Sequence, residues 1–356
     1  PKRKYMQAPE FVFFSLFRND NPYASISLAM ARVLARRHRV WYVNHPYSWK
    51  DLLKTRGDKS MQRRLPGLLR GQVQYEQFSD IPHNFTVVQP PPTLPINFLP
   101  PGRLYDNLHN YNQNVVLKTI KNMLRKHNVG PFVYINCYDP FFAGVLPPAM
   151  GAVFQIYHCI DDITQDPYTA QHGAGLERKA MAEADLTLVT SSNLFRLHEP
   201  HAKRIHTFFN AADVTLFARA LNERFDRPTE LAGRTGPVIG FIGNLDALRI
   251  DFPLIKKTAL AYPHATVLLV GPVNSPELSA LGIDRLPNVV LAGSKPLQAL
   301  PQFLQHMDCV LIPFLCNTLT NSIYPLKINE YLAAGKSVVS TAFSDDIRGF
   351  SDCIYL

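Results

Sequence analysis

Lys327 and Glu330, three positions apart, stand in the most informative stretch of the chain, residues 324–341. Pro325 suits the first position of a helix and Gly335 the position just past its end, so the pattern predicts a short helix between them. Residues three apart share one helix face. A helix N-terminus beside a cation can hold a diphosphate, and a carboxylate one turn further on can accept hydrogen bonds from ribose hydroxyls. An exposed ion pair fits the same spacing, so both interpretations stay open.

A second candidate site follows an expected strand at 238–242. Gly240 and Gly243 allow a backbone to approach a ligand closely, and Arg249 can hold a phosphate through two hydrogen bonds. Ligands of open α/β sheets bind outside the carboxyl ends of the strands, which is where these residues fall. A lone G-x-x-G pattern is weak, however. By itself it favours an ordinary strand-to-helix turn with Asp251 as the helix cap.

Three polar residues, His158, Asp161 and Asp162, lie at or just after the end of another apolar run, 152–159. At the carboxyl end of a strand, His158 or Asp161 can contact a sugar or act as a general base on an acceptor hydroxyl. Either aspartate can instead simply cap the turn that follows. The residue types leave these two interpretations equal.

Residue types that bind metals are present, but their spacing predicts no metal site. His198, His201 and His206 cannot all lie on one helix face, and no carboxylate completes a set, so we interpret them as surface or half-buried histidines. The cysteines are odd in number and form no C-x-x-C pair, which argues against a disulfide framework or a thiolate zinc site and suits a reducing cytosol. They are Cys137, Cys159, Cys309, Cys316 and Cys353.

The composition describes a folded chain whose charge is unevenly distributed. Of the 356 residues, 46% are apolar and 18% are charged, which excludes a disordered or coiled-coil protein. The formal net charge is +9, but residues 1–70 carry +11 and residues 71–356 carry −2. We expect no membrane span, because no run of about 18 uncharged apolar residues occurs. The chain opens on Pro1 without a signal-peptide apolar region, and we expect a segment of a longer protein.

Signatures of several other enzyme classes are missing. No G-x-G-x-x-G follows the first expected strand, and no P-loop, H-E-x-x-H or G-x-S-x-G occurs, which argues against hydride transfer, P-loop chemistry and serine hydrolysis. D-x-D, the carboxylate pair with which metal-dependent sugar transferases hold a diphosphate-bound cation, is also absent.

Short apolar runs alternate with helical patterns along the whole chain, which predicts parallel sheets covered on both faces. The rhythm restarts near residue 237, so we expect two doubly wound α/β domains, at 1–213 and 237–356, joined by a polar linker at 214–236. The expected strands are 11–17, 40–43, 85–88, 132–136, 152–159, 186–190, 238–242, 266–270, 289–291, 309–312 and 337–340. The expected helices are 23–37, 104–127, 176–184, 252–262, 297–307 and 326–334.

The second half resembles the nucleotide-sugar domain of retaining glycosyltransferases of family four, which have the GT-B architecture of two Rossmann-like domains with a cleft between them. The branch that it resembles makes teichuronic acid and capsule-type polysaccharides. The motifs that carry the resemblance stand in order at 240–244, 271–272, 286–293, 300–301, 308–314 and 325–341, with looser likeness in the first half.

The resemblance implies roles for individual residues. Glu330 matches the carboxylate that binds the ribose of the nucleotide, and Lys327 and Arg249 match basic positions near the donor diphosphate. In the same site the family's second carboxylate is replaced here by Ser322, and an arginine that often follows the G-x-x-G turn is replaced by Asn244.

Two further departures from the family concern whole segments. Residues 18–22 stand where many relatives carry a glycine-rich loop. The chain also stops at Leu356, where relatives continue with helices that cross back onto the first domain, so we expect a truncated or disordered C-terminus.

Two segments of the first half suggest contacts with an acceptor. Residues 49–70 mix cations with leucine pairs, which suits either an anionic membrane surface or a solvated loop, because Gly57, Pro66 and Gly67 interrupt any long helix. Residues 89–102 hold six of the 29 prolines and must form an extended loop. Since the family's first domain binds the acceptor, this loop can lie near the acceptor's entrance.

We therefore expect a metal-independent retaining glycosyltransferase without a cofactor. It would move a sugar from a nucleoside-diphosphate donor, with UDP favoured, to a glycan or lipid-linked acceptor in surface polysaccharide synthesis. The expected location is the cytoplasm, peripherally at the inner face of the membrane. The alternatives are a nucleotide-sugar 2-epimerase of the same fold and a non-catalytic polyanion or nucleic-acid binder, against which no nucleic-acid motif accompanies the charge.

Overall fold

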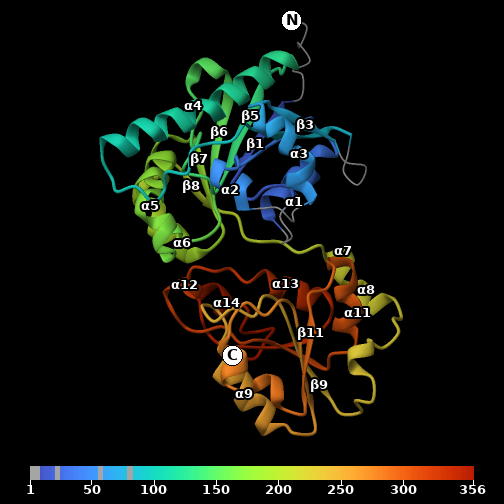
Figure 1. The fold of residues 1–356 in the computed structure, drawn as a ribbon. Helices are drawn as coiled ribbons and strands as arrows, with labels where there is room; N and C mark the ends of the chain where they lie inside the picture. The colour runs from blue at the N-terminus through green and yellow to red at the C-terminus, as the bar shows by residue number, and fades with distance from the viewer. Residues whose placement is uncertain (1–8, 21–24, 55–58, 78–82) are drawn as a thin grey trace, which may run out of the picture. The chain divides into compact units, whose positions relative to one another are not determined.

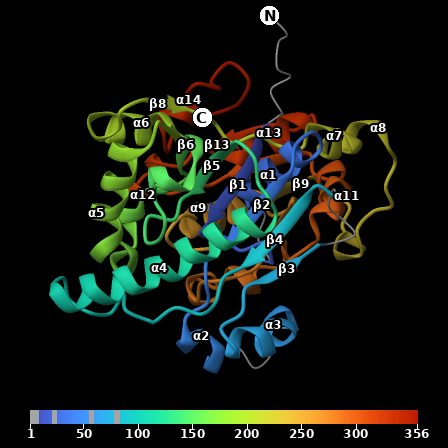
Figure 2. The ribbon, with the colours of Figure 1, turned by 90° about the horizontal axis from the view of Figure 1, so that it is seen from above.

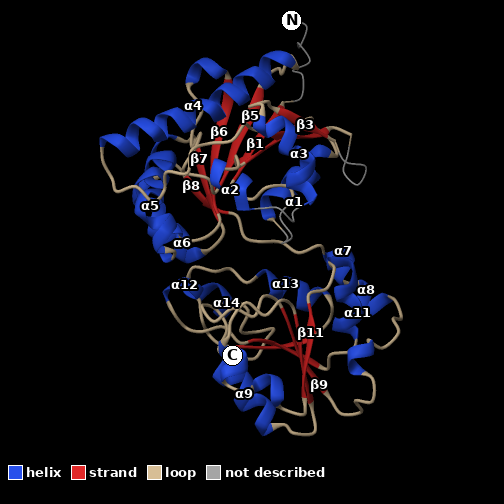
Figure 3. Cartoon of the chain, viewed as in Figure 1, coloured by secondary structure: helices blue, strands red, loops and turns tan. Residues whose placement is uncertain are grey.

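The computed structural model describes residues 9–20, 25–54, 59–77 and 83–356. It divides into two compact units (Figure 1). The first comprises Pro1–Thr190 with Leu194–Phe208, and the second comprises Ser191–Asn193 with Phe209–Leu356. Each is an α/β unit built on one sheet (Figure 3).

The described part of the first unit contains an eight-stranded sheet in the order β3-β4-β2-β1-β5-β6-β7-β8. Every neighbouring pair is parallel except β3 and β4, which are antiparallel. The parallel strands are added outward on both sides of β1, with the antiparallel β3 at one edge, so the sheet has the doubly wound topology. The strands are β1 (Glu10–Ser15), β2 (Val40–Asn44), β3 (Gln74–Glu76), β4 (Phe85–Gln89), β5 (Phe132–Cys137), β6 (Ala152–Cys159), β7 (Leu186–Val189) and β8 (Ile205–Thr207).

Both faces of this sheet are buried, which explains the apolar runs without polar alternation. Along β1, Val12 and Phe14 pack on one face with Val116 of α4, and Phe13 packs on the other face with Ala31 of α1. Helix α3 lies beside the β3 edge, and α5 and α6 lie beside the β8 edge (Figure 2). The helices are α1 (Ile26–Ala35), α2 (Trp49–Lys54), α3 (Lys59–Leu69), α4 (Arg103–Lys126), α5 (Pro167–Glu183) and α6 (Ser192–His198).

The second unit contains a five-stranded, wholly parallel sheet in the order β11-β10-β9-β12-β13, again doubly wound. Its strands are β9 (Val238–Ile242), β10 (Thr266–Val270), β11 (Val289–Gly293), β12 (Cys309–Ile312) and β13 (Ser337–Ser340). Its helices are α7 (Val214–Phe217), α8 (Arg219–Asn222), α9 (Phe252–Ala261), α10 (Glu277–Ala280), α11 (Leu300–Gln305), α12 (Thr318–Asn321), α13 (Leu326–Ala333) and α14 (Asp345–Arg348).

The two Rossmann-like units confirm the fold class predicted from the sequence, and every expected strand is present. Two edge strands, β3 and β8, escaped prediction because each has only three residues. The segment 214–236, expected as a polar linker, forms α7 and α8. Its Leu216, Phe217 and Leu231 are buried in the core of the second unit. The prediction of a linker was wrong because the polar composition of this segment outweighed its few apolar side chains, which pack in the core.

The proline-rich segment 89–102 is extended, as predicted, and hydrogen bonds from α4 hold it in place. The side-chain amide of Asn112 in α4 accepts from the backbone N–H of Leu94 at 2.8 Å and donates to the carbonyl of Leu94 at 2.9 Å. Pro90 and Pro92 are buried. A side chain of α4 thus satisfies both backbone groups of Leu94 in a segment whose prolines have no N–H to donate. Among the described residues, no helix is long and apolar enough to cross a membrane.

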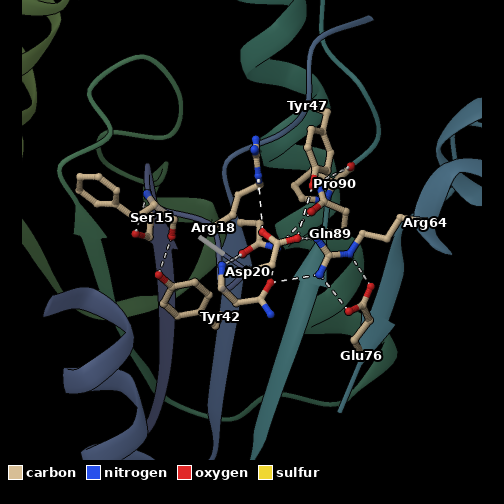
Figure 4. A network of polar contacts seen from close by, with 12 residues as sticks. Ser15, Arg18, Asp20, Tyr42, Tyr47, Arg64, Glu76, Gln89 and Pro90 are labelled. Atoms are coloured by element: carbon tan, nitrogen blue, oxygen red, sulfur yellow. Dashed lines mark hydrogen bonds and ion pairs between the residues drawn. The ribbon is translucent and has the colours of Figure 1, made fainter. Parts of the chain in front are cut away.

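The basic segment 49–70 forms α2 and α3 rather than a loop, and residues 55–58 within it lie outside the described residues. One of its cations, Arg64, is completely buried. Its guanidinium donates two hydrogen bonds to the Glu76 carboxylate, at 2.5 and 2.9 Å, and one to Asp20 at 2.5 Å (Figure 4). Arg64 therefore joins α3 to β3 and to the loop after β1, and it does not face a membrane.

Replacement of Arg64 by alanine should destabilise the first unit by about 3 kcal/mol, because it leaves two carboxylates without their buried partner. Arg63→Ala is the matched control. Arg63 is exposed and lies 3.4 Å from the same Glu76, so its loss should cost less than about 1 kcal/mol. Urea unfolding of both variants measures the difference, and equal destabilisation would refute this role for Arg64.

Candidate functional site

Helix α13 carries the two charged residues that the sequence singled out. Pro325 stands at its N-cap, one position earlier than predicted. At the other end, Gly335 has φ = 65°, the N–H of Lys336 bonds to the carbonyl of Tyr331, and that of Gly335 bonds to Leu332. This pair of bonds is a Schellman motif, which ends the helix and starts β13. Local sequence therefore fixes the length of α13.

Tyr331 holds α13 against the tip of β9. Its hydroxyl accepts from the backbone N–H of Ile242 at 2.9 Å and lies 3.3 Å from the carbonyl of the same residue. Strand β12 pairs with β9 only at Ile239 and Gly240, so the tyrosine takes the place of the sheet partner beyond that point. Nothing in the sequence pattern indicated this role, because a tyrosine on the apolar face of a helix is predicted to be an ordinary core residue.

Two glycines bring the tips of β9 and β10 and the Lys327 side chain together. A Cβ atom on Gly243 would lie 2.3 Å from Cε of Lys327, and one on Gly271 would lie 1.9 Å from the carbonyl oxygen of Gly243. Larger residues cannot occupy either position without a shift of the structure. The Lys327 ammonium also lies 5.9 Å from the ring centroid of Phe241, a cation–π contact.

Lys327 and Glu330 are half-buried, and neither side chain makes a hydrogen bond or an ion pair with a described residue. The exposed ion pair that the spacing allowed is therefore not formed. Burial lowers the pKa of Lys327, although Glu330 partly opposes the shift, and Arg249 lowers it further. Burial raises the pKa of Glu330, and Lys327 opposes that shift. Two desolvated charges without close partners form a site that can bind a ligand carrying both anionic and hydroxyl groups.

Arg249 lies close enough to Lys327 for their charges to interact, so two cations stand at this site. Its guanidinium is held 2.6 Å from the Asp246 carboxylate, and its carbonyl accepts from the N–H of Leu315 at 2.8 Å. The segment after β12 thereby positions Arg249. Asp251 caps α9 through a bond from Leu254 N at 2.8 Å, as predicted.

The two positions that depart from the family pattern are occupied by small, hydrogen-bonded side chains. Ser322 is buried, and its hydroxyl lies 3.5 Å from the carbonyl of Thr318. Asn244 accepts a hydrogen bond from the amide of Asn274 at 2.8 Å. Neither side chain adds a charge to the site, so its charges come from Lys327, Glu330 and the ion pair of Arg249 with Asp246.

The candidates His158 and Asp161 belong to the first unit. His158 has no exposed surface, burial lowers its pKa to about 4, and its only ring neighbour recorded among the described residues is Phe208. Its imidazole is therefore neutral and enclosed, and the structure gives it no access to a ligand. Asp161 is half-buried. Asp162 caps the turn that follows, accepting from the N–H of Thr164 at 3.0 Å, so the capping interpretation holds for it.

A histidine–carboxylate pair at the carboxyl edge of the first sheet was missed. Nδ1 of His45, just after β2, lies 2.5 Å from Oδ2 of the buried Asp139, which follows β5. The backbone N–H groups of Phe141 and Phe142 orient the same carboxylate. The two residues are 94 positions apart, and only the parallel pairing of β2, β1 and β5 brings them together.

Comparison with known proteins finds a family model that matches part of the chain and solved structures with the same fold. Residues 236–352 match the family model of group 1 glycosyl transferases. Solved structures with the same two-unit fold include a trehalose-phosphate synthase from Burkholderia xenovorans (11% identity, 97% of this chain and 88% of that chain, TM-score 0.65). HepE from Anabaena, solved with UDP and glucose, is another (15% identity, 96% and 82%, TM-score 0.59). The chain thus has the GT-B fold, and its residues 236–352 are similar to the group 1 glycosyl transferases.

Among curated proteins, the chain is 30% identical over 201 residues to TuaH of Bacillus subtilis strain 168, which is named as a teichuronic acid biosynthesis glycosyltransferase. The match covers 52% of this chain and 50% of that protein, so the chain spans about half the length of the curated relative it matches.

Replacement of Tyr331 by phenylalanine should lower the free energy of unfolding of the second unit by about 1–3 kcal/mol, because it leaves the buried N–H of Ile242 unpaired. Tyr262→Phe is the control, since that side chain is exposed. Urea denaturation followed by circular dichroism measures both variants. Equal midpoints would show that the hydroxyl does not support the site.

Proposed function

We propose that the protein is a retaining glycosyltransferase that takes a sugar from a nucleoside-diphosphate donor. The observation that carries the proposal is the pair Lys327 and Glu330, two half-buried charges without partners among the described residues, beside the glycine-built tip of β9. The group 1 glycosyltransferase match covers these residues. HepE, which shares the fold, was solved with UDP-glucose, which favours UDP as the donor's nucleotide.

Each residue of this site then has a role that its geometry allows. The Glu330 carboxylate accepts hydrogen bonds from the ribose hydroxyls, and Lys327 and Arg249 neutralise the diphosphate. Gly243 leaves room for the Lys327 side chain at the strand tip. We propose that the leaving diphosphate, stabilised by these cations, accepts the proton of the acceptor hydroxyl on the same face of the sugar, which needs no protein nucleophile and no metal.

For the acceptor we propose a glycan or lipid-linked saccharide of a surface polysaccharide, bound by the first unit, with Asp161 as one candidate contact. TuaH is named for teichuronic acid biosynthesis, a polymer of this kind. Trp49, Leu53 and Leu69 of α2 and α3 are exposed apolar side chains, and Lys50, Arg63 and Arg70 are exposed cations near them in the chain. Such a mixture suits the anionic inner face of a membrane.

Glu330→Ala should weaken binding of UDP by about ten- to a hundredfold, the loss expected for hydrogen bonds to a charged group. Isothermal titration calorimetry measures the affinity, and a screen of other nucleoside diphosphates identifies the preferred base. The control is Glu277→Ala, because Glu277 is an exposed glutamate of α10. If Glu330→Ala binds UDP as tightly as the parent, the site is wrongly assigned.

Gly243→Ala should weaken UDP binding through the displacement of Lys327, because the new methyl group overlaps the lysine side chain. Gly175→Ala, which meets no atom within 4 Å, should leave the affinity unchanged.

Product analysis with a nucleotide sugar separates the remaining functions. Sugar turnover without any acceptor would indicate an epimerase, and binding that falls steeply with salt but ignores nucleotides would indicate a polyanion binder.

A further inference from the structure

Three side chains with metal-binding atoms meet inside the first unit. Cys159 ends β6, Glu177 lies in α5 and His198 ends α6. Their sulfur, carboxylate oxygen and ring nitrogen all lie within 4.8 Å of one another, and the three residues are 0, 2 and 6% exposed. This cluster lies at the carboxyl end of a parallel strand, in the unit that does not hold the proposed donor site.

The side chain of His198 is the strongest indication that this cluster binds a ligand. Both of its ring nitrogens are buried, and neither has a hydrogen-bond partner among the described residues. Buried polar groups are almost always paired, so an orphaned imidazole indicates an ion or a water that completes the site. The groups that face it are a thiol and a carboxyl group. Both are groups that bind metal ions, so the neighbours of His198 form a set of metal ligands with it.

A second layer of contacts orients the ligands, as in known metal centres. The hydroxyl of Tyr157 donates to Oε1 of Glu177 at 3.0 Å. The thiol of Cys159 lies 3.4 Å from the carbonyl oxygen of Asp161. Three separate elements, β6, α5 and α6, therefore present ligands that are already buried and partly fixed in direction.

We propose that Cys159, Glu177 and His198 bind a divalent transition-metal ion, with zinc as the best fit. A thiolate, a carboxylate and a neutral imidazole carry two negative charges, which a divalent cation balances, so the occupied site is neutral in its buried surroundings. Mixed sulfur, nitrogen and oxygen ligands suit zinc and not magnesium or calcium. Ligand atoms around zinc lie about 3.5 Å apart, so the side chains need to move by only about 1 Å, and a water can fill the fourth position.

The role of this ion is structural, and the proposal does not depend on the donor site. The ion would join α5 and α6 to the carboxyl end of β6, in the way that buried zinc sites contribute to folding stability. The other two histidines of the sequence cluster, His201 and His206, are exposed and belong to no such group in the described structure. His198 therefore acts with residues that are distant in sequence.

The test uses the full chain carrying Cys316→Ser and Cys353→Ser, because these two exposed thiols can bind metal adventitiously. The protein is dialysed against Zn²⁺, and bound metal is measured by mass spectrometry. We expect about one zinc per chain. With Co²⁺ instead, coordination by the Cys159 thiolate should give a near-ultraviolet charge-transfer band. A folded parent that binds neither Zn²⁺ nor Co²⁺ overturns the proposal and leaves a buried water as the partner of His198.

Variants of the same background locate the ion. Cys159→Ser should abolish the cobalt charge-transfer band, and Glu177→Gln and His198→Gln should each lower the zinc affinity at least tenfold, whereas His201→Gln should leave it unchanged. Circular dichroism identifies any variant that fails to fold.

Chelation should lower the melting temperature of the parent but not that of the ligand variants. Undiminished metal binding in a folded Cys159→Ser variant would place the ion elsewhere and overturn the assignment. UDP binding should persist after chelation, which separates this test from that of the donor site.

Discussion

The second unit depends on a close backbone contact between two strand tips. Gly271 lies so near the carbonyl of Gly243 that neither a methyl group nor any larger side chain fits there. This contact lets the turn after β9 lie flat against the turn after β10, with the N–H of Gly243 bonded to the carbonyl of Val270. The space left above Gly243 is the space that Lys327 occupies. The position of the charged site therefore follows from the absence of two side chains.

The same region holds two charged side chains that pair with no described residue. Tyr331 and the Schellman motif fix α13, which carries Lys327 and Glu330, at its strand contact and at its end. Arg249, which is held by Asp246, adds a second positive charge. A folded protein tolerates desolvated charges when the surrounding structure determines their position, and such strain is typical of binding sites.

The buried polar side chains of the first unit differ in whether they have hydrogen-bond partners. Arg64 is surrounded by carboxylates and satisfied, and it ties the basic segment to the sheet. His158 and His198 are equally hidden but have no recorded hydrogen-bond partners among the described residues. For His158, burial keeps the ring neutral. For His198, the cysteine and the glutamate beside it form the set of ligands with which we propose that one ring nitrogen binds an ion. The +11 charge of residues 1–70 is thus partly internal and is not a property of the surface alone.

The sequence alone predicted the doubly wound class, every strand except the short β3 and β8, the cap of α9 and the glycine that ends α13. It also singled out Lys327, Glu330 and Arg249, whose role in binding stays a prediction. These features are local, because hydrophobic periodicity and capping residues act within a few positions of the chain. Only the tertiary structure decided that Arg64 is buried, that 214–236 joins the core, that Tyr331 supports β9, and that Cys159, Glu177 and His198 meet. These contacts join residues between 12 and 89 positions apart or depend on which side chains a sheet covers, and no local pattern encodes them.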